Sequence, residues 1–115
     1  MPGAREVRSD LAGPAMGLRE DIPDVVESCA TMRSAVMTDG ALSAKVKELI
    51  ALAIGATRGC DGCVAAHGLG AVRRGATEAE VAEAMGLVIL MTGCPGDPRG
   101  ARALDAYRER ETLNG

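Results

Sequence analysis

Four residues near the middle of the chain have the types and spacing that thiol chemistry requires: Glu48, Cys60, Cys63 and His67. Two cysteines separated by two residues can form a disulfide, and a helix N-terminus beside them stabilises a thiolate. A histidine four residues after Cys63 shares its helix face and can accept the thiol proton. A glutamate can orient that histidine or return its proton. The set predicts redox chemistry at a cysteine pair, assisted by a Glu/His proton relay.

A helical hairpin from Ser43 to Gly75 is expected to bring these residues together. Residues 43–57 read SAKVKELIALAIGAT, which is apolar at helical spacing and on most of the opposite face, so a buried helix is expected. Residues 60–75 form a second helix, with both cysteines in its first turn and a glycine as its C-terminal stop. The short turn makes the two helices antiparallel, and the helical rise places Glu48 within about one turn of His67. A carboxylate at this apolar position needs such a partner, because desolvating an unpaired charge is costly.

Composition limits the class of protein. A length of 115 residues suits one domain, and a net charge of −3 without a basic patch argues against a nucleic-acid partner. No run approaches the ~18 consecutive apolar residues of a membrane span, and the N-terminus lacks the apolar run of a signal peptide. We therefore expect a cytoplasmic protein with no membrane partner. Four cysteines in that compartment indicate chemistry or metal binding before structural disulfides.

The expected fold is all-α, because no segment shows the alternation typical of a strand. Residues 1–20 show no sustained period and are expected to form an N-terminal arm. Residues 21–111 form the helical domain, and residues 112–115 a C-terminal tail. Within the domain, a first helix is expected over residues 23–39 and a last one over residues 99–111.

A further helix is expected after Gly75, where Thr77 and Glu80 form a capping box. The turn that follows this helix, from Cys94 to Pro98, separates it from the last one. Cys94 at the edge of this turn and Cys29 on the apolar stripe of the first helix are both expected to be structural, with Cys29 buried as a small hydrophobic residue.

The core is expected to be completed by another subunit. The chain has no Phe or Trp and one Tyr, so its core of Ala, Leu, Val, Ile and Met buries little area per residue. Nearly all-apolar short helices in so small a chain favour a homo-oligomer.

The four residues also allow three other interpretations. Two Cys, a His and a Glu have the ligand types of a tetrahedral zinc site. A Cys-x-x-Cys pair in such a site usually works with a second, similarly spaced ligand pair, which this sequence lacks. A second interpretation makes the cysteines and the histidine structural core residues, which leaves the buried acid unexplained. In the third, Glu48 and His67 carry out proton transfer without redox use of the thiols.

The segment ELIALAIGATRGCDGCVAAHGLGAVRRGAT resembles the core motif of the carboxymuconolactone decarboxylase and alkylhydroperoxidase D (AhpD) superfamily. The spacing of the four residues matches the AhpD pattern throughout, and a looser likeness extends from Ile22 to Tyr107. The resemblance implies an AhpD-like helical fold, with the helical hairpin at its centre, assembled as a trimer or a hexamer. It implies no metal and no other cofactor.

The same resemblance implies a role for each residue. The cysteine matching Cys63 is oxidised to a sulfenic acid by a small hydroperoxide, and the one matching Cys60 then closes a disulfide. Glu48 and His67 would be the proton relay, and a dithiol, in some members a lipoyl protein, would be the reductant. The helix dipole alone would favour Cys60 as the attacking thiol, and Asp61 beside it would partly oppose the thiolate. A decarboxylase-like reaction and a non-catalytic binding role are the alternatives; true decarboxylases generally lack the cysteine pair.

Overall fold

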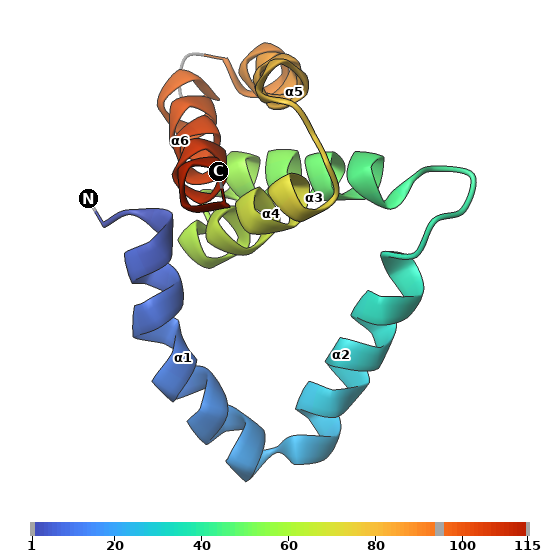
Figure 1. The fold of residues 1–115 in the computed structure, drawn as a ribbon. Helices are drawn as coiled ribbons and strands as arrows, with labels where there is room; N and C mark the ends of the chain where they lie inside the picture. Colours follow the sequence, from blue (N-terminus) through green and yellow to red (C-terminus); the bar gives the residue numbers. More distant parts are fainter. Residues whose placement is uncertain (1, 94–95, 115) are drawn as a thin grey trace.

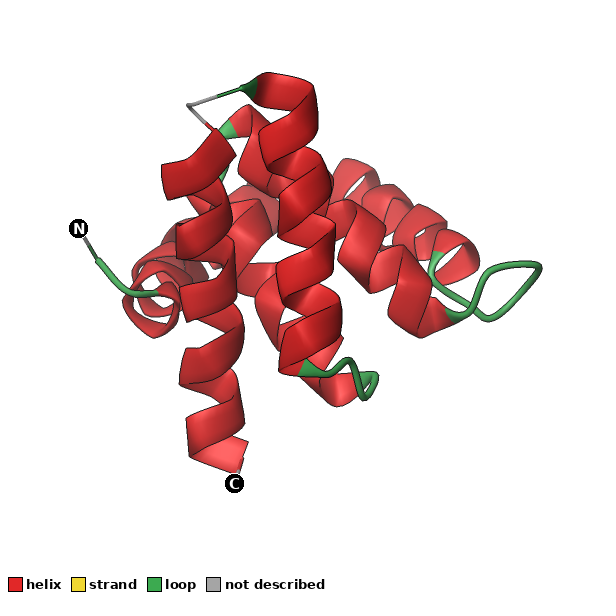
Figure 2. Ribbon diagram, turned by 90° about the horizontal axis from the view of Figure 1, so that it is seen from above, coloured by secondary structure: helices red, strands yellow, loops and turns green. Residues whose placement is uncertain are grey.

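The computed structural model describes residues 2–93 and 96–114, with side chains as far as residue 109. These residues form helices joined by short loops and contain no strand, which confirms the all-α fold (Figures 1 and 2). The helices are α1 (Ala4–Asp21), α2 (Pro23–Val36), α3 (Ala44–Arg58), α4 (Asp61–Arg73), α5 (Glu78–Thr92) and α6 (Gly96–Asn114). Within the described residues, no helix combines the length and the apolar character that a membrane span requires.

The predicted hairpin is formed by α3 and α4, and it lies at the centre of the fold (Figure 1). Ser43 caps α3 by accepting a hydrogen bond from the backbone N–H of Val46 at 3.2 Å. Gly59 ends α3 with a φ of 67°, a left-handed conformation that favours glycine. The chain then reverses at Cys60, and α1, α5 and α6 pack around the hairpin.

The buried face of α3 is the one that carries Glu48. It consists of Ala44, Glu48, Leu52, Gly55 and Ala56. The opposite face, with Ile50 and Ile54, is exposed in the single chain. The expectation that this helix is buried on all sides is therefore wrong for one copy of the chain. The prediction that Glu48 is buried is correct.

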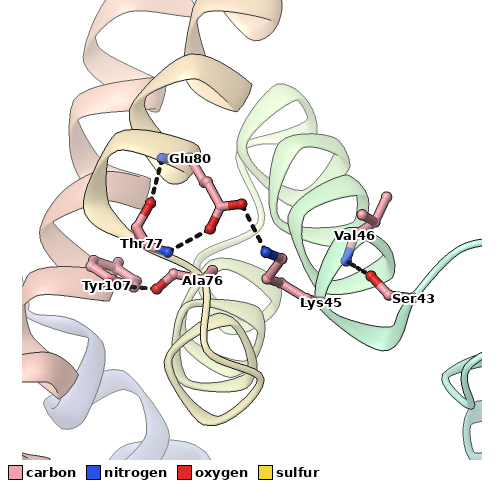
Figure 3. A network of polar contacts seen from close by, with 7 residues as sticks. All are labelled: Ser43, Lys45, Val46, Ala76, Thr77, Glu80 and Tyr107. Carbon is pink, nitrogen blue, oxygen red and sulfur yellow. Dashed lines mark hydrogen bonds and ion pairs between the residues drawn. The ribbon is translucent and has the colours of Figure 1, made fainter.

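The capping box at the start of α5 joins three helices (Figure 3). Thr77 accepts the backbone N–H of Glu80 at 3.1 Å, and the Glu80 carboxylate accepts the backbone N–H of Thr77 at 2.8 Å. The same carboxylate binds the Lys45 ammonium of α3 at 2.8 Å. The buried Tyr107 of α6 donates its hydroxyl to the carbonyl of Ala76 at 2.7 Å. These contacts fix the turn between α4 and α5 and so the end of the hairpin.

The N-terminal segment is a helix, where we expected an irregular arm. Its first turn is held by α6, because the Glu109 carboxylate accepts the backbone N–H groups of Ala4 and Arg5 at 3.0 and 2.9 Å. Those are N–H groups that a helix N-terminus leaves without an intrahelical partner. Ala4 and Val7 are buried against the core. The tertiary contacts of α1 therefore outweigh its weak local pattern.

The helix α2 begins at Pro23 as predicted, but it buries none of its residues. Cys29 is exposed, so its predicted burial is wrong for the single chain. Figure 1 shows α1 running away from the core and α2 running back toward the start of α3, as the two arms of a V. Within the described part of the chain, the large apolar side chains of α2 remain exposed.

Two boundaries of the last helix differ from the prediction. It begins at Gly96 rather than near residue 99, since a proline at position 98 is tolerated in a first helical turn. It continues to Asn114, through most of the predicted tail of residues 112–115. Cys94, predicted to be structural, lies outside the described residues.

Candidate active site

Glu48 and His67 contact each other directly across the hairpin. The Nδ1 atom of His67 lies 2.8 Å from Oε2 of Glu48, which confirms the predicted proximity. The Glu48 side chain is 12% exposed and the His67 side chain 26%, so the pair is largely shielded from water. When the Glu48 carboxylate is ionised it can only accept a hydrogen bond, and Nδ1 then carries the proton of this contact. Nε2 of the neutral imidazole is then the ring nitrogen that can accept a proton from another group.

A glycine in α4 makes room for this pair. A Cβ atom on Gly70 would overlap all three atoms of the Glu48 carboxylate. Gly70 lies three residues after His67, on the same side of α4, where the two helices approach each other. The absent side chain allows the carboxylate to lie between the helices and reach the imidazole.

The cysteine pair lies at the turn of the hairpin, where α3 passes into α4. The structure joins Cys60 and Cys63 in a disulfide, with their Cα atoms 5.3 Å apart. Cys60 is the N-cap of α4, and its Sγ accepts the backbone N–H of Cys63 at 3.2 Å. Sulfur at this position lies at the positive end of the helix dipole. The pair thus has the environment that favours a thiolate once it is reduced.

Close contact with α3 holds Cys63 in place. A Cβ on Gly55 would lie 2.9 Å from the Cβ of Cys63, so only a glycine allows the helices this approach. The backbone N–H of Cys60 donates to the carbonyl of Gly55 at 3.0 Å. On the other side, α1 places the Leu11 side chain against Gly62, between the two cysteines.

All four predicted residues lie on this hairpin, in two adjoining groups. Cys63 and His67 are four residues apart on α4, so the Glu48–His67 pair lies one helical turn from the disulfide. Among the described residues, no group of three or more His, Cys, Asp or Glu side chains is arranged to hold a metal ion.

Two arginines of α6 contact the turn that carries the cysteines, and the sequence analysis did not identify them. Arg99 donates from Nη1 to the carbonyl of Thr57 at 2.6 Å. Arg102 donates from Nε to Oδ1 of Asp61 at 2.8 Å. Both partners lie about forty positions earlier in the chain. No local pattern could have indicated these contacts.

The fold and site together define a class: all-helical proteins with a disulfide-forming Cys-x-x-Cys pair at a helix N-terminus and a Glu/His pair one turn away. The family model described as "Carboxymuconolactone decarboxylase family" matches residues 23–106. This protein belongs to the carboxymuconolactone decarboxylase family.

Three individual proteins are similar to this chain, and one of them, a solved structure, is named as a member of the same family. An uncharacterized protein of Cupriavidus necator is 39% identical over 82 residues, which are 71% of this chain and 73% of the relative. "Uncharacterized protein 4 in cox locus" of Paracoccus denitrificans is 42% identical over 50 residues, 44% of this chain and 45% of the relative. The crystal structure of a carboxymuconolactone decarboxylase family protein from Legionella pneumophila, in its apo form, superposes with a TM-score of 0.89. That structure is 31% identical, and the match covers 93% of this chain and 96% of the other.

Proposed function

We propose that the protein is a thiol-dependent peroxidase of the AhpD type, which reduces a small hydroperoxide at Cys60 and Cys63. The observation that carries this proposal is the Glu48–His67 contact, one helical turn from a cysteine pair that is close enough to form a disulfide. A structural role alone would leave the shielded carboxylate without a purpose, whereas a proton relay uses it.

The reaction begins with the dithiol form of the pair. The Cys63 thiolate attacks the terminal peroxide oxygen, the O–O bond breaks, and the alcohol leaves after taking up a proton. Cys63 is then a sulfenic acid. The Cys60 thiol attacks its sulfur, a disulfide forms, and water is released. An external dithiol reduces the disulfide by exchange, so one hydroperoxide and one dithiol give one alcohol, one water and one disulfide.

His67 and Glu48 move the protons in this scheme. Nε2 of His67 accepts the Cys63 proton and returns it to the departing alkoxide. Glu48 holds Nδ1 and stabilises the imidazolium that forms in between. Their limited exposure strengthens this charge interaction, because less water screens it. The scheme uses protein side chains only and needs no metal or organic cofactor. It suits the cytoplasm, where dithiol donors, including lipoyl groups, keep such pairs reduced.

We also propose that the working form is a homo-oligomer, a trimer or a hexamer, in which α2 packs on another copy of the chain. Large apolar side chains of α2 are exposed in one copy; they are Val25, Met32 and Val36. A 14-residue helix that buries none of its residues gains little stability from its own chain. An identical copy offers a complementary apolar face, because Ile50 and Ile54 of α3 are exposed as well.

A coupled assay tests the peroxidase proposal. The reduced protein is mixed with cumene hydroperoxide and dihydrolipoamide, and peroxide consumption is followed together with the mass of the Cys60–Cys63 peptide. We expect catalytic consumption, and a dithiol-reversible loss of two hydrogens confined to this peptide. The Cys29→Ser variant is the matched control and should keep full activity, because Cys29 lies on α2, outside the hairpin.

Each negative result of the coupled assay would lead to a different conclusion. Reversible disulfide formation without peroxide consumption would overturn the peroxidase and indicate a disulfide carrier. No preference for the Cys60–Cys63 peptide over Cys29 would overturn the redox role altogether. In that case the Glu48–His67 pair would point to proton-transfer chemistry or a binding role.

A further inference from the structure

Asp61 places a negative charge where the proposed reaction needs a thiolate. It is the first residue of α4 and directly follows Cys60, so both lie at the same helix N-terminus. A carboxylate beside a thiol raises the pKa of that thiol, because two like charges repel. The helix dipole stabilises both a thiolate at Cys60 and the carboxylate of Asp61. The carboxylate therefore already uses part of this stabilisation.

Arg102 of α6 pairs with this carboxylate. Its Nε lies 2.8 Å from Oδ1 of Asp61, and the two side chains are 25% and 47% exposed. Its Nη2 donates to the carbonyl of Pro2 at 3.1 Å, so the guanidinium is held from two directions. Because the pair is only partly exposed, water and salt screen it less than a fully solvated ion pair.

Other charged groups around the cysteine turn come from α6 and α1. On α6, Arg99 bonds the carbonyl of Thr57 and lies beside Gly59, and Asp105 lines the same small cavity as Asp61 and Arg102. On α1, Arg8 donates to the carbonyl of Ala65.

The hairpin itself contributes the remaining charges. Arg58 is the last residue of α3, and Glu48 and His67 form their own pair one turn along α4. Arg102 binds Asp61 within ion-pair distance.

We propose that Arg102 is a positioning residue of the redox site. By neutralising Asp61, it keeps the thiolate form of the cysteine pair accessible at neutral pH, and it fixes the start of α4 against α6. This inference rests on the proposed redox use of Cys60 and Cys63. It goes beyond that function by assigning control of thiol reactivity to a residue that contacts neither sulfur in the proposed mechanism.

The experiment measures thiol ionisation directly, in a Cys29→Ser/Cys94→Ser background. The protein is reduced and alkylated with iodoacetamide from pH 5 to pH 10, and modification of Cys60 and Cys63 is followed by mass spectrometry. We expect Arg102→Gln to raise the apparent thiol pKa and to slow alkylation at pH 7 by about two- to five-fold. Asp61→Asn should act in the opposite direction. In the double variant, the profile should return toward that of the wild type, because both charges of the ion pair are absent.

Arg99→Gln is the matched control. It removes another arginine that joins α6 to the same turn, but it leaves Asp61 paired, so the alkylation profile should not shift. Circular dichroism verifies that each variant is folded, and Arg102→Lys should restore much of the profile if charge is what matters. An Asp61→Asn variant that is alkylated no faster than the wild type would overturn the proposal, as would an effect of Arg99→Gln equal to that of Arg102→Gln. Alkylation needs no hydroperoxide, so this result is independent of whether the peroxidase assay succeeds.

Discussion

The carboxylate of Glu48 occupies the space that a side chain on Gly70 would fill. The same carboxylate lies 2.8 Å from Nδ1 of His67, which is three residues before Gly70 on α4. The contact between acid and imidazole therefore depends on a residue that takes no part in proton transfer. A single methyl group at Gly70 would compete with the carboxylate for its position.

Gly70→Ala should disable the relay while the protein remains folded. The added Cβ displaces the carboxylate from His67, and we expect kcat/KM for hydroperoxide to fall by about 100-fold, the usual contribution of acid–base catalysis. The overpacking costs about 1–3 kcal/mol of stability, and the better helix propensity of alanine offsets up to about 1 kcal/mol of that. The measurements are steady-state kinetics and urea unfolding.

Gly86→Ala is the matched control for this substitution. Gly86 is also inside a helix, α5, but nothing lies within 4 Å of its Cβ position. We expect unchanged kinetics and a gain in stability of up to about 1 kcal/mol. If Gly70→Ala behaved in the same way as Gly86→Ala, the relay would not depend on the position of Glu48.

The two thiols should prove unequal when each is removed in turn. His67 shares a helix face with Cys63, whereas the N-cap position favours an anion on Cys60. If Cys63 attacks, Cys60→Ser should accumulate a sulfenic acid that reacts with dimedone at Cys63, and Cys63→Ser should remain unlabelled. Labelling is read by mass spectrometry after one equivalent of hydroperoxide. Equal labelling of the two variants would contradict the assignment to Cys63.

Removing His67 should slow sulfenic acid formation at Cys63 most strongly near neutral pH. In the Cys60→Ser background, His67→Ala removes the base that accepts the Cys63 proton, and sulfenic acid formation at pH 7 should slow by about 100-fold. At pH 9 the thiol ionises without help, so the difference should become much smaller. The rate is followed by quenched-flow labelling across this pH range. A loss of the same size at both pH values would mean that His67 acts by some route other than thiol deprotonation.

Acid should weaken the contact between α3 and α5. The hydrogen bond from the Lys45 ammonium, followed by the backbone N–H of Thr77, lowers the pKa of the Glu80 carboxyl from its ordinary value near 4.5. A carboxyl whose pKa is lower in the folded state contributes stability above its unfolded pKa, and this is lost as the pH falls through the folded value. Glu80→Gln should therefore destabilise the protein at pH 7 and much less at pH 3. Thermal unfolding at the two pH values measures this difference, and Glu83→Gln on the same helix is the control.

The hairpin could be predicted because its signals are local. The apolar period of α3, the glycine at position 59 and the capping box at Thr77 each act within a few residues. Once two antiparallel helices are assigned, simple helical rise brings Glu48 to His67. The predicted site residues therefore follow from short-range information.

The parts of the fold and site that were not predicted depend on contacts between residues far apart in the sequence. The first turn of α1 is held by Glu109, more than a hundred positions later, so its weak period gave no indication of a helix. The Asp61–Arg102 pair likewise joins α4 to α6. The stripe on α2 was identified correctly as apolar, but an apolar stripe does not specify which surface covers it. Cys29 was assigned to the core for this reason, and it is exposed in the single chain.

The protein should self-associate through the exposed apolar side of α2. A charge placed on that side should abolish the association. Met32 is 63% exposed and lies on the apolar side of α2 together with Val25 and Val36. If a second copy covers this side, Met32→Glu would bury an unpaired carboxylate at the contact, which is costly enough to dissociate it. Sedimentation velocity at micromolar concentration should show a trimer or hexamer for the wild type and a monomer for Met32→Glu. Ser9→Glu, an equal change of charge on an exposed part of α1, should leave the oligomer intact. A wild-type protein that sediments as a monomer would show that α2 remains uncovered.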